Sequence, residues 1–189
     1  MNSRPSGSPA AILVLLLCLA LSVCASCTST KGNDVNPSLT EETARVHLID
    51  YFRETLTSLP KFVSLALEPA APGDAAKYNA GTAAPCDDKD KSGSGPVNLG
   101  LNYWVHGVAP AENAEYFHKV VQIWRDWKWH IEEDSTSGFL RGRATSPENY
   151  SLTVIDNGFG GLSIIGSSPC FPRTAAGTST PQPSTVPHP

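Results

Sequence analysis

The chain has 189 residues, of which 40% are hydrophobic and 17% are charged, and its formal net charge is −4 at pH 7. This length suits one folded domain between its terminal segments. The sequence has no basic cluster of the kind that neutralises nucleic-acid phosphates or anionic lipid, so we expect no nucleic-acid partner and no polybasic membrane patch.

Residues 1–26 have the pattern of an export signal. A polar start with one positive charge, Arg4, precedes an almost unbroken apolar run over residues 10–23. A run of about 14 residues is shorter than the ~20 of a membrane-spanning helix and is typical of a signal peptide. The alternative, a buried N-terminal helix, is disfavoured because the run has no polar face. We predict that the cell removes residues 1–26.

The segment after the apolar run, residues 21–27, is Leu-Ser-Val-Cys-Ala-Ser-Cys. It resembles the lipobox of bacterial lipoproteins, in which an apolar residue and two small residues precede a cysteine. The resemblance implies that this cysteine receives a diacylglycerol, whose two acyl chains hold a protein stably on a membrane. Small Ser26 favours Cys27 as the lipidated residue, and Cys24 is the alternative, with ordinary secretion as the other possibility. Residues 27–37 are then a flexible polar tether.

Two cysteines remain in the folded region, Cys86 and Cys170. In an exported domain such a pair suggests one disulfide, although two unpaired buried thiols stay possible. A zinc site is disfavoured, since the sequence has no CxxC spacing and its histidines are scattered. We expect no metal and no cofactor.

The first predicted element is an amphipathic helix over residues 40–59. Residues 38–41, Ser-Leu-Thr-Glu, fit a capping box, and five apolar residues follow at helical spacing: Val46, Ile49, Phe52, Leu56 and Leu59. Pro60 ends or kinks this helix, and residues 61–67 are expected to add a turn or two. Residues 68–77 and 86–96 are predicted loops.

Residues 97–105 alternate at first between apolar and polar, as a half-buried strand does. Pro110 suits the first position of a second helix, which ends near Trp127 and has its apolar face at Ala114, Phe117, Val121 and Trp124. Strands are then predicted at residues 129–132, 138–144, 150–155 and 162–165, with a hairpin turn at residues 156–161.

These elements predict a single α+β domain over residues 38–171, in the order α-β-α-β-β-β-β. We expect one antiparallel sheet of four to five strands with two helices packed on one face, and one disulfide. Residues 172–189, which are rich in proline, threonine and serine, are predicted to be disordered.

The order of these parts resembles the small actinobacterial lipoproteins of the LppA-like type. The shared features are the lipobox, an acid-capped helix, a mid-chain cysteine and a closing Gly-x-x-Pro-Cys-Phe at residues 166–171. The resemblance implies anchoring on the extracytoplasmic face of the cell membrane and a disulfide between Cys86 and Cys170. It implies no established activity.

The sequence contains no metalloprotease HExxH, no GxSxG and no P-loop. Glu132, Glu133 and Asp134 are neighbours on a predicted strand, so they point to alternate faces and form a solvated strand end more readily than a catalytic pair. We therefore expect a non-enzymatic binding module. One alternative is a cell-envelope hydrolase in which Glu132 or Asp134 meets His130 or His118, and another is a structural envelope protein without a ligand.

Two groups of residues are candidates for a contact surface. The aromatic residues Trp104, Trp124, Trp127 and Trp129 either line a groove for a protein, glycan or lipid of the envelope, or pack the core. Arg141 and Arg143 share one face of a predicted strand, where they either receive an acidic partner or face solvent.

Overall fold

The computed structural model describes residues 35–70, 78, 81–136, 138–177 and 180–189. The predicted signal peptide and both candidate lipidation residues, Cys24 and Cys27, lie outside the described residues. Residues 33–189 form one compact unit. Within the described ranges, no helix has the length and apolar character needed to cross a bilayer.

Helix α2 spans Glu41–Thr57 and buries one apolar stripe, which includes Leu48, Phe52 and Leu56. Its N-cap is Thr40, whose hydroxyl accepts a hydrogen bond from the Thr43 amide at 3.2 Å. The predicted helix is therefore confirmed, but the predicted capping box was two residues early. Ser38 instead donates its amide to Asn36 Oδ1 at 3.1 Å, in the turn before the helix.

Val46 also departs from the expected apolar face, because half of its surface is exposed. Pro60 follows the end of α2, and the next residues do not continue the helix. They form strand β1 (Ser64–Ala66), which pairs with the end of β3.

In the described part of the chain the sheet has eight strands, all paired antiparallel. After β1 they are β2 (Thr82–Pro85), β3 (Val97–His106), β4 (His130–Thr136), β5 (Phe139–Thr145), β6 (Ser151–Asp156), β7 (Leu162–Ser167) and β8 (Thr185–Val186). The order across the sheet is β4-β5-β6-β7-β3-β1-β8, and β2 also pairs with β3. The α+β class is confirmed, whereas the expected four to five strands were too few.

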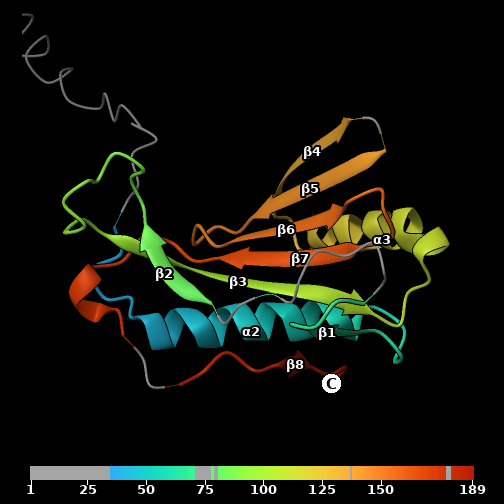
Figure 1. Cartoon of the computed structure of the whole chain (residues 1–189), viewed down its shortest axis with the longest axis horizontal. Helices are drawn as coiled ribbons and strands as arrows, with labels where there is room; N and C mark the ends of the chain where they lie inside the picture. Colours follow the sequence, from blue (N-terminus) through green and yellow to red (C-terminus); the bar gives the residue numbers. More distant parts are fainter. Residues whose placement is uncertain (1–34, 71–77, 79–80, 137, 178–179) are drawn as a thin grey trace, which may run out of the picture. The chain divides into compact units, whose positions relative to one another are not determined.

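Both helices pack on the same face of the sheet (Figure 1). Helix α3 (Asn113–Asp126), which follows a 3-10 turn at Pro110–Glu112, lies over β5 and β6, while α2 lies along β3 and β7. The backbone approaches closely at Gly166, where a Cβ would lie 2.8 Å from the Phe52 ring. Phe52 in turn meets Tyr103 edge to face, with ring centroids 5.4 Å apart. We call this side of the sheet the covered face.

The C-terminal residues differ from the expected disordered tail. Residues 173–175 form a 3-10 turn, and β8 adds to the edge of β1, with Val186 opposite Leu65. Val186 is buried, and the Tyr103 hydroxyl donates to the Pro183 carbonyl at 2.9 Å. This segment is therefore ordered by one buried apolar side chain and by hydrogen bonds to its backbone, although its composition alone predicted disorder.

The disulfide between Cys86 and Cys170 is present, and it joins residues 84 positions apart. It links the loop after β2 to the segment that follows β7. Beside it, Val35 bridges to Cys170 and the Asn36 amide donates to the Cys170 carbonyl at 2.8 Å. The last residues of the predicted tether are thus bound to the domain.

Candidate functional site

Two of the four candidate tryptophans belong to the packing of the domain. Trp124 is fully buried, and its indole Nε1 donates to the Thr55 hydroxyl at 3.0 Å, which joins α3 to α2. Trp104 is buried on the opposite face of the sheet, where it stacks with Tyr78 at 4.8 Å between ring centroids. Neither side chain is available to a partner on the surface.

Trp127 and Trp129 lie at the end of α3, where they meet Tyr51 of α2 and Tyr150 before β6. We call these four residues the aromatic corner. Their rings contact each other edge to face or tilted, with centroids 4.9 to 6.5 Å apart. These aromatic contacts pack the end of α3 against α2 and against the turn between β5 and β6.

Burial affects the ionisation of the aromatic corner. It raises the pKa of Tyr150 to about 12, and burial is also the main cause of the raised pKa of Tyr51. The Tyr150 hydroxyl is buried and has no hydrogen-bond partner among the residues that the structure describes. The aromatic corner is therefore a packed element rather than a flat platform for a ligand.

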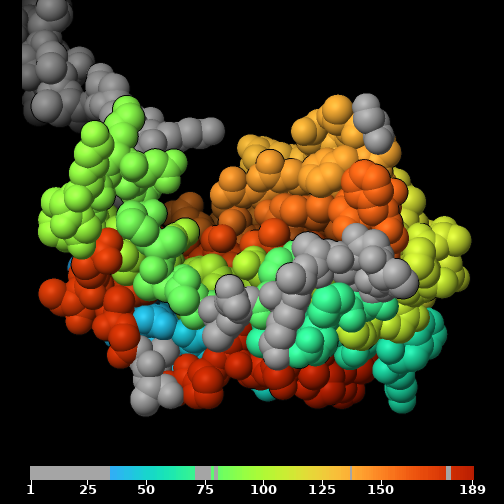
Figure 2. All heavy atoms as spheres, viewed as in Figure 1, coloured from blue at the N-terminus to red at the C-terminus, as the bar shows by residue number. Residues whose placement is uncertain are grey.

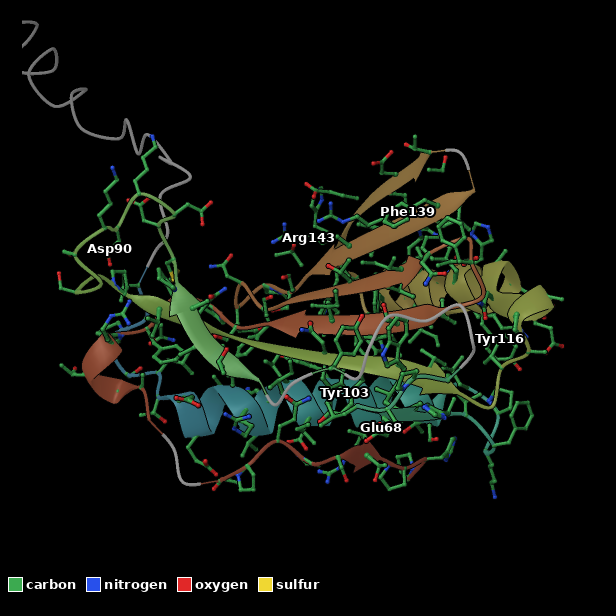
Figure 3. The ribbon with its side chains drawn as sticks, viewed as in Figure 1. Glu68, Asp90, Tyr103, Tyr116, Phe139 and Arg143 are labelled. Atoms are coloured by element: carbon green, nitrogen blue, oxygen red, sulfur yellow. A yellow bond between two sulfur atoms is a disulfide. The ribbon has the colours of Figure 1, made fainter. Side chains whose placement is uncertain are left out.

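Arg141 and Arg143 remain as candidates on the second face of the sheet, which the helices leave uncovered. We call this side the open face. Both arginines are exposed on β5, and Figure 3 shows Arg143 on the β4–β5 arm, which projects from the rest of the sheet. In the space-filling view the surface is hollowed between the orange β4–β5 arm and the green atoms of residues 82–96 (Figure 2).

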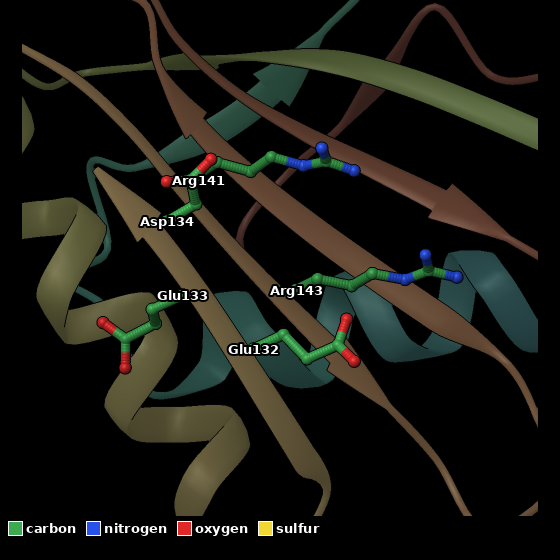
Figure 4. Close-up of a pocket in the computed structure, with 5 residues that line it drawn as sticks. All are labelled: Glu132, Glu133, Asp134, Arg141 and Arg143. Carbon is green, nitrogen blue, oxygen red and sulfur yellow. The ribbon is translucent and has the colours of Figure 1, made fainter. Parts of the chain in front are cut away.

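The two arginines help to line a pocket of about 140 Å³. Its lining residues are Glu132, Glu133, Asp134, Arg141 and Arg143. In the close-up the two arginine side chains extend in the same direction, across the strands and away from the Asp134 carboxylate (Figure 4). Arg143 Nη2 lies 3.5 Å from the Ser151 hydroxyl of β6. Among the residues that the structure describes, neither guanidinium lies within ion-pair distance of a carboxylate.

The strand register explains where the charges on the open face lie. Three rows of residues cross from β4 to β3. The rows are Asp134-Arg141-Ile155-Ser163-Trp104, then Glu132-Arg143-Thr153-Ile165-Asn102, then His130-Thr145-Ser151-Ser167-Gly100. The carboxylates are all on the edge strand β4, and beyond the arginines the rows contain only neutral side chains. The guanidiniums therefore extend from the acidic edge toward an uncharged surface.

Glu133, the third acid that lines the pocket, forms an ion pair on the covered face of the sheet. Glu133 alternates with its neighbours and pairs with Arg125 of α3 at 2.5 Å. Cross-strand pairs of opposite charge stabilise a two-stranded arm. In the register Glu132 lies opposite Arg143 and Asp134 opposite Arg141, but in the described part of the chain neither arginine forms an ion pair with the acid opposite it.

The expected histidine–carboxylate arrangement is only partly formed. His130 Nε2 lies 3.6 Å from Glu132 Oε1, with side chains 74% and 61% exposed. His118 is on α3, where its ring contacts Phe117. In the described residues no group of histidines, cysteines or acids is arranged to hold a metal ion. The His130–Glu132 pair is exposed to solvent rather than enclosed in a pocket.

A buried ion pair at the start of α2 was not predicted from the sequence. Arg45 of α2 is 4% exposed and pairs with Glu41 at 2.7 Å, while the Gly177 amide donates to the other oxygen of Glu41 at 2.6 Å. A second pocket, of about 190 Å³, lies between α2 and the chain at residues 180–183. The acid and base four residues apart at the start of α2 were the available signal, but their burial depends on a C-terminal segment that was predicted to be disordered.

Comparisons with known proteins add no relative. No family model matches the chain, no curated protein is significantly similar to it, and no solved structure is significantly similar to its fold. The geometry of the open face is therefore the basis for a functional proposal.

Proposed function

We propose that this chain is an exported lipoprotein of the LppA-like type, anchored by Cys27, or alternatively by Cys24, to the extracytoplasmic face of the cell membrane. The pattern of residues 1–27 supports this proposal, because a lipobox follows an apolar run of signal-peptide length. The Cys86–Cys170 disulfide adds support, since such bonds persist in oxidising compartments outside the cytoplasm.

The anchored domain acts as a non-enzymatic binding module, and its contact surface is the open face of the sheet. One observation carries this part of the proposal. Arg141 and Arg143 direct their guanidiniums away from the Asp134 carboxylate and across the neutral rows of β6 and β7, while Glu132 extends alongside Arg143 (Figure 4). An unpaired guanidinium offers several fixed hydrogen-bond donors, which makes it a common anchor in recognition sites.

Fatty-acid labelling of cysteine variants tests the anchor. We expect Cys27→Ser to lose the labelled lipid and Cys24→Ser to keep it, because only one thiol follows a small residue at the cut. Mass spectrometry of the mature N-terminus identifies the modified residue. Equal labelling of the wild type and of the variant with both substitutions contradicts the anchor.

Photocrosslinking in cells that export the chain tests the contact surface. A photoreactive residue replaces Thr153, which lies beside Arg143 on the open face, and the control replaces Glu54, which is exposed on α2. We expect adducts at position 153 that decrease when both arginines are changed to glutamine, and none at position 54. An absence of adducts at position 153 contradicts a contact surface here and favours a structural role.

A further inference from the structure

We propose that Arg141 and Arg143 bind a phosphate group carried by a sugar or another polyol on the open face of the sheet. This inference rests on the proposed function, because it names the ligand of the same surface. It depends on three properties of the site: the spacing of the guanidiniums, the position of the carboxylates, and the side chains beyond the arginines.

The spacing of the arginines suits one phosphate between them. They are two residues apart on β5, so their Cα atoms are separated by about 6.6 Å along the strand, and their side chains run side by side (Figure 4). Charge-assisted N–H···O contacts are about 2.8 Å long. A phosphate placed between neighbouring side chains accepts one such contact from each, and the planar guanidinium matches phosphate geometry better than a point charge does.

The Asp134 carboxylate lies behind the two guanidiniums, and the Glu132 side chain extends alongside Arg143 (Figure 4). Glu132 and Asp134 are on the edge strand, on the far side of the arginines from β6, and Glu133 pairs with Arg125 on the covered face. A phosphate over β6 therefore meets the guanidiniums before it meets a carboxylate. The net charge of −4 makes this a local attraction, which excludes a general affinity for anionic surfaces.

The neutral rows beyond the arginines suit hydroxyl groups. Thr153, Ser167 and Asn102, which are half-buried, supply side chains that both donate and accept hydrogen bonds. There is room above them, since a Cβ added at Gly100 would have nothing within 4 Å. A sugar or polyol attached to the phosphate would lie on this part of the open face, where its hydroxyls would meet these side chains.

Calorimetric titration of the full chain in a neutral detergent tests the inference. The probe is glycerol 1-phosphate, with glycerol as the neutral match and glycerate as the carboxylate match. We expect measurable binding of glycerol 1-phosphate, and no measurable binding of glycerol or glycerate. Arg141→Gln and Arg143→Gln should each weaken the binding of glycerol 1-phosphate about tenfold or more, because each removes a charge-assisted contact. Arg53→Gln, an exposed arginine on α2 that pairs with Asp50, is the matched control and should bind as the wild type does.

Two further arms identify the source of the phosphate. The titration is repeated with detergent micelles that contain phosphatidylglycerol or, as the neutral match, phosphatidylcholine. Stronger binding to phosphatidylglycerol than to glycerol 1-phosphate supports a lipid headgroup, and equal binding supports a soluble phosphorylated glycan.

The inference is overturned if glycerol 1-phosphate binds no better than glycerol or glycerate, or if the β5 variants bind as Arg53→Gln does. Crosslinking at position 153 separates this failure from that of the proposed function. Arginine-dependent adducts without phosphate binding would refute only the ligand class, whereas the loss of both results would refute the contact surface as well.

Discussion

The two faces of the sheet are built from alternate residues of the same strands, yet they have opposite chemistry. On β6, Leu152 and Val154 face the helices and are fully buried, while the alternating residues Thr153 and Ile155 are half-buried on the open face. The covered face excludes water with apolar side chains, and the open face presents hydroxyls, amides and two arginines. Because side chains alternate along a strand, we expect substitutions on the covered face to change stability and substitutions on the open face to change recognition.

Two phenylalanines give the largest test of this separation. Phe52 is fully buried between α2 and the covered face, and Phe159 is 81% exposed in the β6–β7 turn. We expect Phe52→Ala to lower the free energy of unfolding by about 3–5 kcal/mol and Phe159→Ala to change it by less than about 0.5 kcal/mol. Urea denaturation measures both. Similar losses for the two variants would contradict the assignment of the core.

Alkaline pH gives a second test, through Tyr150 at the end of the covered face. Burial raises its folded-state pKa to about 12, above the ordinary value of 10.0. The unfolded chain therefore loses this proton first, and stability that is intact below pH 10 falls as the pH rises from 10 to 12. The loss attributable to Tyr150 should approach about 2 kcal/mol.

Tyr150→Phe is the matched control for the pH effect. Its unfolding free energy at pH 7 should equal or exceed that of the wild type, because the buried hydroxyl has no hydrogen-bond partner in the described part of the chain. Between pH 10 and 12 the variant should lose less stability than the wild type in urea titrations at each pH. Parallel pH profiles would show that Tyr150 ionises as freely as in the unfolded chain.

The edge strand β8 extends the comparison to the C-terminal segment. Val186 lies on the covered face opposite Leu65, and Thr185 is exposed on the open face opposite Ala66. Val186→Ala should cost about 1–2 kcal/mol through lost burial, and Thr185→Ala should cost less than about 0.5 kcal/mol. If thermal unfolding shows no difference between them, β8 does not contribute to the core.

The sequence predicted the elements whose pattern is long enough to be periodic. Both helices and the strands β3 to β7 were located, since apolar residues recur in them at a spacing of 3.6 or 2. Strands β1, β2 and β8 have only three, four and two residues. Their conformation depends on pairing with distant residues, such as Val186 with Leu65, and no local pattern contains that information.

The candidate site was predictable to a similar extent. Alternation placed Arg141 and Arg143 on one face of a strand, and the structure places both on the open face. The direction of their side chains depends on the register with β4 and β6, which sequence spacing did not give. The burial of Trp104 and Trp124 likewise depends on tertiary contacts with Tyr78 and Thr55.

The smallest expected effect on stability is that of substituting the two arginines of the open face. Arg141 and Arg143 are exposed on β5, so Arg141→Gln and Arg143→Gln should each change the unfolding free energy by less than about 0.5 kcal/mol. The measurement is urea denaturation at low and high salt, where any loss of cross-strand attraction to Asp134 or Glu132 appears only at low salt. A loss of several kcal/mol would mean that the arginines hold the β4–β5 arm in place, and weaker ligand binding by these variants would then reflect a disordered arm. If stability is unchanged, weaker ligand binding by these variants reflects the loss of the guanidiniums themselves.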